Sequence, residues 1–322
     1  MKSFFKHIVV WIITLEARFL LARTKPTIIA ITGNIGKTSV KDAIFEVIKT
    51  KVHARKSEKS FNSEIGVPLS VLGLENGWNN PLLWFKNIID GFLLMVHPGK
   101  YPKVLVLEMG VDRPGDMEKL TKWIRPHVVV LTRLPDVPVH VEFFNSPEEV
   151  SREKIKLVEA LRKEGTFVYN HDDEQVVNVA KGIFQPSIGY SRYSPSPFVA
   201  SHDASYYENG HAAGTEFVLT NGNESVPFRV AGSLGVQHAY TYGAAAAVGS
   251  IFGVTLKEVA EALKNHVPPP GRMRVVPGLK NTLIIDDTYN ASPAALEGAL
   301  QTRDIGMGCE IDRHFNCTVQ IN

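Results

Sequence analysis

A short glycine-rich turn directly after an apolar run constrains this chain more than any other feature. The run is Ile28-Ile29-Ala30-Ile31, the turn is Gly33-Asn34-Ile35-Gly36-Lys37-Thr38, and residues 40–47 then predict a helix. A buried strand that leads through such a turn into a helix presents backbone N–H groups to a phosphate. Only two residues separate the glycines, whereas the common phosphate loop has four, so the loop indicates a narrower class of nucleotide site.

The residues of this loop predict how a nucleotide is held. Lys37 is expected to contact the terminal phosphates and Thr38 to bind Mg²⁺, which are the roles of the lysine and the hydroxyl in phosphate loops. The other loop residues are expected to approach the phosphates through their backbone N–H groups. They are Gly33, Asn34, Ile35, Gly36 and Ser39.

Apolar runs alternate with helical patterns along the first half of the chain, and the runs are short enough to be strands buried on both faces. They span residues 28–32, 104–108, 128–131 and 166–170, and further helical patterns span 116–123 and 147–163. This alternation predicts an α/β fold with a mostly parallel sheet and flanking helices, as in P-loop NTPases. Between residues 190 and 233 Ser, Pro, Gly and Asn interrupt short apolar pieces, which predicts a small β-rich insertion.

The length and composition of the chain indicate how many domains it contains and which partners it has. Its 322 residues, of which 44% are hydrophobic, suffice for about two domains. We expect an apolar helix over 1–24, a central nucleotide-binding domain over 25–300, and a polar tail over 301–322 that is the remnant or the start of a missing C-terminal domain. The formal net charge of +2 disfavours nucleic acid as a partner, and the two cysteines form no disulfide framework, which favours the cytoplasm.

The N-terminal apolar segment leaves three alternatives open. Residues 4–21 are strongly apolar but include charged side chains, and the uninterrupted run 8–13 is far shorter than the ~20 residues that span a bilayer. The segment is expected either to pack on the body of the protein or to lie as an interfacial helix on the inner face of a membrane. A transmembrane span is the third alternative.

Three side chains with useful chemistry follow predicted strands. Glu108 ends the run 104–108, His140 lies in the loop after the run that ends near residue 131, and Asp286 ends a last predicted strand. Ligands of open α/β sheets bind outside the carboxyl ends of the strands, so carboxylates and an imidazole there suit the Mg²⁺ of a bound nucleotide. The alternative is that these residues only cap the loops that follow.

Lys154 occupies an unexpected position. The string Ser146-Pro147-Glu148-Glu149 predicts a helix start with a capping box, and Lys154 then falls on the same helix face as Val150 and Leu157. A buried lysine costs free energy unless it is paired or modified. Lys154 is therefore expected either to be held in an active site or to extend past its apolar neighbours into solvent.

Four further residues are weaker candidates for a site. Asn62 and Glu64 lie in a polar loop before an apolar helix, where they either bind substrate or cap that helix. Arg272 follows a proline-rich connector and suits either a phosphate or a surface carboxylate. His238 precedes an alanine-rich helix and either contacts the nucleotide or merely starts that helix.

In combination these segments resemble the Mur ligase family, the ATP-dependent amide-forming enzymes of peptidoglycan precursor synthesis. Residues 32–38 are similar to the family's nucleotide loop, and strings similar to its other motifs follow in the family's order. They are residues 62–68, 107–110, 140–142, 270–272 and 286–293. The resemblance covers residues 25–300 and is closest to the members that add D-alanyl-D-alanine to UDP-N-acetylmuramoyl-tripeptide.

The resemblance implies ATP and Mg²⁺ as cofactors and a mechanism. The loop and Lys37 would hold the ATP phosphates, while Thr38, Glu108 and His140 would serve the Mg²⁺ sites. Transfer of the γ-phosphoryl group to a carboxylate of the substrate would give an acyl phosphate, which an incoming amine would convert to an amide. Lys154 matches the family lysine that becomes an anionic carbamate and helps a second Mg²⁺.

Further roles follow from the same resemblance. Arg272 would contact phosphate, Asp286 would contact ribose, and His238 would lie beside the nucleotide. Asn62 and Glu64 would belong to the substrate side of the site. The expected partners are a UDP-muramoyl-peptide and an amino acid or dipeptide.

The chain also departs from the family pattern, and the departures leave other functions open. Ala239 and Tyr242 stand where the family usually has asparagines that contact the nucleotide, and the family's UDP-sugar-binding and amino-acid-binding domains have no counterpart in the sequence. One alternative is a non-catalytic nucleotide-binding or precursor-binding module at the membrane. Another is a ligase of the folate or polyglutamate type.

Overall fold

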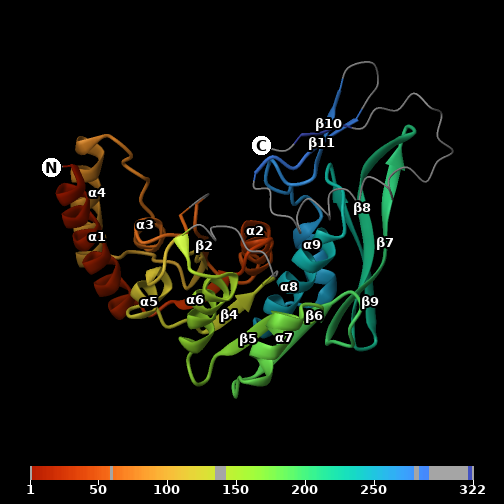
Figure 1. The fold of residues 1–322 in the computed structure, drawn as a ribbon, viewed down its shortest axis with the longest axis horizontal. Coiled ribbons are helices and arrows are strands. Elements are labelled where there is room, and N and C mark those ends of the chain that lie inside the picture. The colour runs from red at the N-terminus through yellow and green to blue at the C-terminus, as the bar shows by residue number, and fades with distance from the viewer. Residues whose placement is uncertain (1, 59–60, 135–142, 279–282, 290–317, 321–322) are drawn as a thin grey trace.

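The computed structural model describes residues 2–58, 61–134, 143–278, 283–289 and 318–320. Its main sheet has nine strands in the order β2-β3-β1-β4-β5-β6-β7-β8-β9 (Figure 1). Their bounds are β1 Thr27–Thr32, β2 Ala54–Lys56, β3 Val104–Glu108, β4 Val128–Leu131, β5 Thr166–Asn170, β6 Ser187–Ser191, β7 Phe198–Glu208, β8 His211–Asn221 and β9 Glu224–Ala231. Neighbours from β2 to β7 pair in parallel, and β7, β8 and β9 pair antiparallel, so the predicted, mostly parallel sheet is confirmed.

Helices cover both faces of this sheet. They are α1 Lys2–Thr24, α2 Lys37–Ile48, α3 Gly66–Leu72, α4 Pro81–Val96, α5 Asp116–Thr121, α6 Pro147–Glu159, α7 Glu174–Lys181, α8 Gln237–Ile251 and α9 Leu256–Leu263. One apolar core joins the sheet to α2, α8 and α9, and a second joins it to α1, α3, α5 and α6. Ile29 and Ile31 of β1 enter the first core, and Ile28 and Ala30 enter the second. Both faces are apolar because successive side chains of a strand alternate between them.

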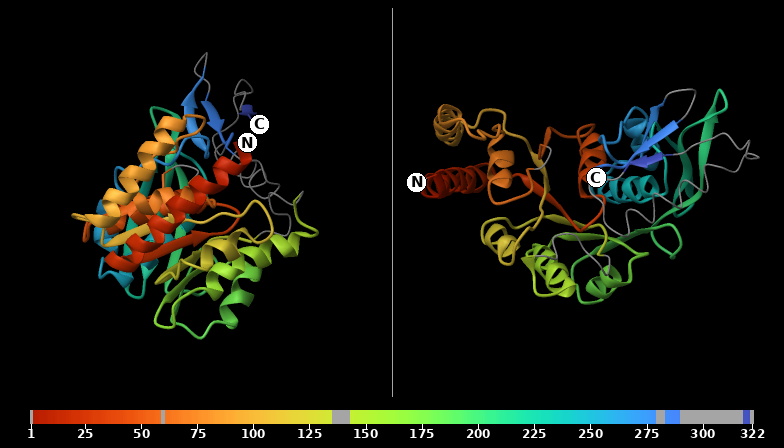
Figure 2. Two further views of the ribbon diagram at one scale, coloured as in Figure 1. Left: turned by 90° about the vertical axis from the view of Figure 1, so that its left-hand side faces the viewer. Right: turned by 45° about the horizontal axis from the view of Figure 1, so that its top comes forward.

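The outermost layer consists of α1 and α4, which lie side by side (Figures 1 and 2). Gly91 permits their close approach, because a Cβ at this position of α4 would lie 2.2 Å from a carboxylate oxygen of Glu16 in α1. The Arg23 guanidinium of α1 donates a 3.0 Å hydrogen bond to the carbonyl of Met95 in α4. Within the described part of the chain no helix combines the length and apolarity needed to cross a membrane.

The segment predicted as a β-rich insertion continues the main sheet. β7 pairs in parallel with β6 through Tyr190 and Phe198, and the long β7–β8–β9 meander follows. Tyr242 of α8 packs edge-on against Phe217 and Phe228, with ring centroids 5.8 Å apart in both pairs. These aromatic contacts join the meander to the same apolar core as the parallel strands.

A separate sheet contains β10 Arg274–Pro277, β11 Leu283–Asp286 and β12 Thr318–Gln320. β10 pairs antiparallel with β11, and β11 pairs in parallel with β12. The sequence-based expectation that Asp286 ends a strand of the same sheet as Glu108 is therefore wrong. The short apolar run 283–285 predicts a strand but contains no information about which sheet the strand joins.

Candidate active site

The glycine-rich turn connects the carboxyl end of β1 to the N-terminus of α2 and is held from β4. Gly33 has φ 136°, and a Cβ there would lie 2.1 Å from Oγ1 of Thr132. The Thr132 hydroxyl donates a 2.7 Å hydrogen bond to the carbonyl of Ile35, and the N–H of Asn34 donates one of 2.8 Å to the carbonyl of Arg133. Glycine is required at position 33 because both its backbone conformation and its contact with Thr132 exclude a side chain.

The start of α2 has the features of an anion site. Gly36 is the N-cap residue, with φ 82° and no side-chain cap. The first N–H groups of a helix have no acceptor within the helix, and the helix dipole makes this end positive. Both side-chain polar atoms of Asn34 are buried and have no partner among the residues that the structure describes. A phosphate at this position would accept hydrogen bonds from the first N–H groups of the helix.

Lys37 lies at the first position of α2. Its Nζ donates a 3.3 Å hydrogen bond to the carbonyl of Asn34. Burial lowers the pKa of the Lys37 ammonium, and the negative charge of Glu108 opposes this shift. An anion bound to the loop would stabilise this buried charge.

Glu108 reaches the same place from β3. It pairs with Ile31 of β1 in the sheet, which places it beside the start of the turn. The Asn62 amide donates a 3.3 Å hydrogen bond to Oε1 of Glu108, and Ser57 accepts one of 2.9 Å from the Glu108 N–H. The other carboxylate oxygen is buried without a partner in the described residues. A carboxylate with an unused oxygen is a suitable ligand for Mg²⁺.

Lys154 is buried, with only 2% of its surface exposed, so the alternative that it extends into solvent is wrong. Its Nζ has no hydrogen-bond partner among the described residues. Burial, together with the nearby charge of Lys37, lowers the pKa of Lys154 to about 7, and the charge of Asp112 opposes both effects. These electrostatic interactions show that Lys37 and Lys154 lie in one region beside the turn, together with the carboxylates of Glu108 and Asp112.

The capped start of α6 differs from the predicted capping box in one bond. Ser146 accepts a 3.3 Å hydrogen bond from the Glu149 N–H, as the pattern predicts. Glu149 does not return a bond to the Ser146 N–H, because its carboxylate accepts from the N–H and the side-chain amide of Asn145 instead. The helix still begins at Pro147, so Lys154 keeps the predicted face.

Arg272 joins the turn from far along the chain. Its guanidinium donates a 3.0 Å hydrogen bond to the Thr38 hydroxyl and lies 4.3 Å from the ring centroid of Tyr289. Its Nε is buried and has no partner among the described residues. A phosphate on the turn would lie within reach of a cation with an unused donor.

His238 and Asp286 have local partners. His238 is buried, its Nε2 lies 2.8 Å from the Ser233 hydroxyl, and burial lowers its pKa to about 4, so the ring is neutral. Ser233 in turn donates to the carbonyls of Arg272 and Met273. His238 therefore helps to hold the segment that carries Arg272. Asp286 accepts hydrogen bonds from the N–H and hydroxyl of Thr288, and its contact with ribose stays a prediction.

The remaining predicted residues differ in their distance from the turn. Asn62 lies beside the charged groups at the turn, because its side chain is hydrogen-bonded to Glu108. Its carbonyl accepts a 2.8 Å hydrogen bond from the Gly110 N–H. Glu64 is 53% exposed and lies 3.6 Å from Lys119, so it is at the surface. His140 lies outside the described residues. Ser39 follows Thr38 in the first turn of α2.

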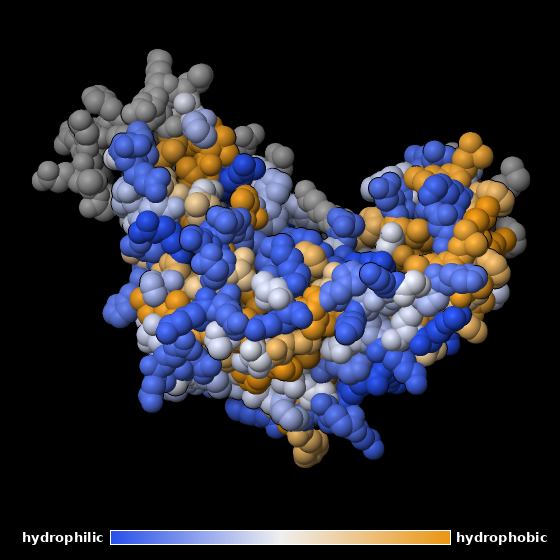
Figure 3. All heavy atoms as spheres, turned by 180° about the vertical axis from the view of Figure 1, so that it is seen from behind, coloured by the Kyte–Doolittle hydropathy of each residue, from blue (hydrophilic) through white to orange (hydrophobic). Residues whose placement is uncertain are grey.

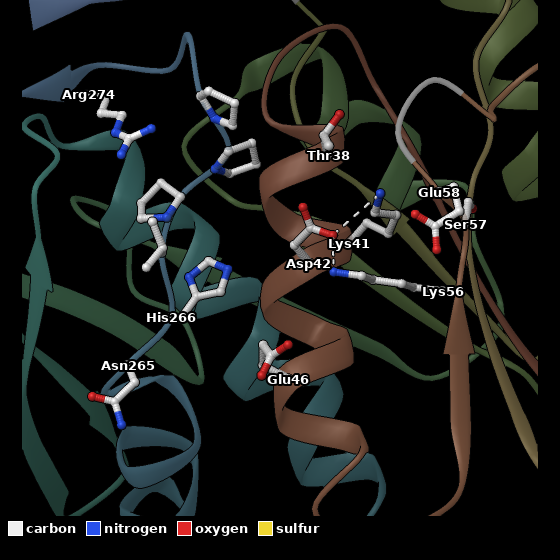
Figure 4. A pocket seen from close by; sticks show the side chains of 14 residues that line it. Thr38, Lys41, Asp42, Glu46, Lys56, Ser57, Glu58, Asn265, His266 and Arg274 are labelled. Atoms are coloured by element: carbon white, nitrogen blue, oxygen red, sulfur yellow. Dashed lines mark ion pairs between the residues drawn. The ribbon is translucent and has the colours of Figure 1, made fainter.

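Three features of the site were not predicted from the sequence, namely Thr132, Asp112 and a cavity beside α2. Thr132 directly follows the predicted strand 128–131, so the rule that singled out Glu108 applies to it as well. The cavity has a volume of about 490 Å³ and extends from Thr38 along α2 (Figure 4). Asp42 lies in it between two lysines, at 3.4 Å from Lys41 and 2.8 Å from Lys56. No sequence signal connects this face of α2 with the connector 265–270 opposite.

A family model and the curated relatives indicate the same family. The model of the Mur ligase middle domain matches residues 31–249. Two curated relatives are both named UDP-N-acetylmuramoyl-tripeptide–D-alanyl-D-alanine ligase. The one from Mycobacterium leprae is 30% identical over 85% of this chain and 50% of its own length. The one from Bacillus subtilis is 25% identical over 88% of this chain and 54% of its own length.

The chain thus spans about half the length of the curated relatives it matches. Its fold is that of the crystal structure of the MurF ligase from Thermotoga maritima in complex with ADP. The two structures superpose with a TM-score of 0.72 over 92% of this chain and 61% of the other, at 24% identity.

Proposed function

Because the chain belongs to the Mur ligase family through its middle domain, we propose that it serves ATP-dependent amide formation on a UDP-muramoyl-peptide in peptidoglycan synthesis. One observation carries the proposal. Lys37, Glu108 and Lys154 come from three separate elements to one glycine-rich turn, and polar atoms of Glu108 and Lys154 are buried without partners among the described residues. Buried polar groups are normally satisfied, so this arrangement supports a site that is completed by a charged ligand.

The chemistry follows from the charges around the turn. The phosphates of ATP would lie on the N-terminus of α2, with Lys37 and Arg272 as cations beside the γ-phosphoryl group. Thr38 and Glu108 would hold Mg²⁺, which would neutralise charge on the phosphates. The unused oxygen of Glu108 and the unused Nε of Arg272 fit such a complex. His140 remains a proposed third contributor to the metal site.

Two bond exchanges complete the proposed reaction. A carboxylate oxygen of the UDP-muramoyl-peptide attacks the γ-phosphorus of ATP, and ADP leaves, which gives an acyl phosphate. The amine of the second substrate then attacks the acyl carbon, the bond from this carbon to the phosphate oxygen breaks, and one amine proton leaves with the phosphate as the amide forms. Lys37 would stabilise the charge on the transferring phosphoryl group, because it lies at the turn and its ammonium is desolvated.

We also propose that Lys154 becomes a carbamate. A pKa of about 7 means that a large share of this amine is neutral near neutral pH. The nitrogen of a neutral amine forms a C–N bond to CO₂ and releases one proton to solvent, which gives the carbamate. The product is anionic, so it would remove the repulsion from Lys37 and supply oxygen ligands for a second Mg²⁺. The solvent-inaccessible position of the amine supports modification more than a role as a surface cation.

For the substrates we propose UDP-N-acetylmuramoyl-tripeptide and D-alanyl-D-alanine, the compounds in the names of the curated relatives. Asn62, which is bonded to Glu108, and Glu64, on the exposed rim, are the proposed contacts on the substrate side. Arg272, Asp286 and His238 are proposed for the nucleotide side, with His238 acting through the segment it holds. The proposed location is the cytoplasm, with peripheral contact of residues 4–21 with the inner face of the membrane.

The test is nucleotide binding and turnover by the 322-residue chain. Titration with Mg²⁺-ATP in a calorimeter should give binding that Lys37→Ala abolishes. Lys49→Ala is the matched control, because Lys49 follows the far end of α2 and is 47% exposed. Phosphate release should require both proposed substrates. Equal ATP affinity in the wild type and in Lys37→Ala, or no ATP binding at all, would contradict the proposal.

A further inference from the structure

The outer face of α1 is apolar although nothing in the described structure covers it. Ile8, Trp11, Leu15 and Phe19 follow one another at helical spacing and are each between 40% and 66% exposed. The opposite face of the helix, with Ile13 and Leu20, is fully buried in the core. One apolar face is enough to pack α1 on the protein, so the second needs a different explanation.

The neighbouring helix α4 also has an exposed apolar face. Leu82, Phe85, Ile89, Phe92 and Val96 form one stripe at spacings of three and four residues, and they are between 37% and 79% exposed. Figure 3 shows orange surface on the lobe that α1 and α4 form, at the right of that view. An exposed apolar surface that spans two adjacent helices is far more than the scattered side chains of an ordinary surface, and it marks an interaction site.

The charges beside this surface are positive. α1 contains Lys6, Arg18 and Arg23 and only one acidic residue, Glu16, which is 6% exposed and faces Gly91 rather than solvent. The only acidic residue of α4 is Asp90, and it pairs with Lys86. Cations at the rim of an apolar face attract anionic lipid headgroups, whose surface potential is negative.

A cavity lies where the C-terminal ends of α1 and α4 meet. It has a volume of about 310 Å³ and is lined by residues 24–26 and 98–103. Three of the lining residues are lysines, namely Lys25, Lys100 and Lys103, and none of the lining residues is acidic. A concave site with several lysines and no carboxylate is suited to a phosphate group.

We propose that α1 and α4 together bind the surface of an anionic lipid bilayer, with the lysine-lined cavity taking a lipid phosphate. The two helices lie in the plane of the interface, and the large side chains of both stripes, with Trp11 and Phe85 among them, insert between the headgroups. This inference rests on the outer faces of α1 and α4 and on the lysine-lined cavity at their C-terminal ends, and it is independent of the proposed ligase activity. It enlarges the contact expected from residues 4–21 by a second helix and a headgroup site.

The test is co-sedimentation of the full chain with two kinds of vesicle, one of phosphatidylcholine alone and one with about a third phosphatidylglycerol. The wild type should bind the anionic vesicles and bind the neutral ones much more weakly. Trp11→Ser/Phe85→Ser should weaken binding by at least roughly tenfold, or about 1.4 kcal/mol. Phe184→Ser is the matched control, because Phe184 is a fully exposed aromatic residue that follows α7.

A second pair of variants tests the cavity. Lys100→Glu/Lys103→Glu should weaken binding to anionic vesicles by roughly tenfold or more and reduce its salt dependence. Lys181→Glu/Lys264→Glu carries the same change in net charge at exposed ends of α7 and α9 and should bind like the wild type. Thermal melts monitored by circular dichroism check that each variant is folded.

Three outcomes would overturn the inference. The first is a wild type that sediments with neither vesicle. The second is a wild type that elutes as a dimer, binds no vesicle and is split into monomers by Trp11→Ser/Phe85→Ser, which would assign the face to a second copy of the chain. The third is binding that both lysine double variants reduce equally, because net charge rather than the cavity would then explain it.

Discussion

Replacing Lys154 by methionine should raise the stability of the folded chain and abolish the proposed activity. The ammonium of Lys154 is 2% exposed and has no hydrogen-bond partner among the described residues. Burial, together with the charge of Lys37, lowers its pKa from 10.5 to about 7. Methionine has a similar length and no charge, so it fills the same space without the cost of desolvating an ammonium.

The magnitude and its sign follow from proton linkage. A shift from 10.5 to about 7 corresponds to a cost of about 4 kcal/mol at pH 7. Methionine loses the attraction of Asp112 and packs imperfectly, so we expect a net gain of about 2–3 kcal/mol. Because the folded pKa lies below the unfolded one, the unfolded wild type binds more protons between pH 7 and 10.5. The stability of the wild type therefore rises with pH across this window, and the advantage of the variant shrinks.

Urea unfolding at several pH values, in buffers free of CO₂ and Mg²⁺, measures this difference. The matched control is Lys156→Met on the same helix. Lys156 pairs with the buried carboxylate of Glu153 at 2.7 Å, and this hydrogen bond raises its pKa. The control should therefore lower the free energy of unfolding. A Lys154→Met variant that is less stable than the wild type at pH 7, or whose difference from it does not change with pH, would refute the reasoning.

Three further predictions use other parts of the structure. Gly33→Ala should lower the affinity for ATP at least roughly tenfold in calorimetry, because φ is 136° and the new Cβ would meet Oγ1 of Thr132 at 2.1 Å. Glu108→Gln should leave the melting temperature nearly unchanged but weaken Mg²⁺ binding, measured by titration in the presence of ADP, because an amide replaces a carboxylate with an unused oxygen. Burial raises the pKa of Glu16 to about 7 from 4.5, so the folded chain binds the extra proton and wild-type stability falls as pH rises through this window. Glu16→Gln should remove that part of the pH dependence in urea unfolding, and an unchanged profile would contradict it.

Local sequence patterns are sufficient to predict much of the fold and part of the candidate site. The alternation of short apolar runs and helical periods predicts the parallel strands, because a strand that is buried on both faces has no polar positions. The same logic identified Lys154, since a charged residue on an apolar helix face is detectable from spacing alone. Its burial beside the turn follows from the packing of α6, and the sequence left this choice open.

Other features depend on contacts between distant segments. Arg272 and Thr38 are hydrogen-bonded across most of the chain, and no local pattern connects them. The sequence pattern predicts His238 beside the nucleotide, and this stays a prediction. The contact of His238 with Ser233, which is bonded to the carbonyl of Arg272, is not detectable from the sequence. Tyr242, which stands in place of a usual asparagine, packs between Phe217 and Phe228 and is 1% exposed.

The glycine-rich turn, the strand before it and the helix after it are specified by the residues that form them. These depend on the backbone freedom of glycine and on the periodicity of neighbouring residues, which are local properties. Long-range packing establishes which side chains surround the turn, that Asp286 lies in a second sheet, and that α4 adds its apolar stripe to that of α1. Those outcomes require segments far apart in the chain to meet, and the free energy of such contacts depends on the packing of the whole molecule.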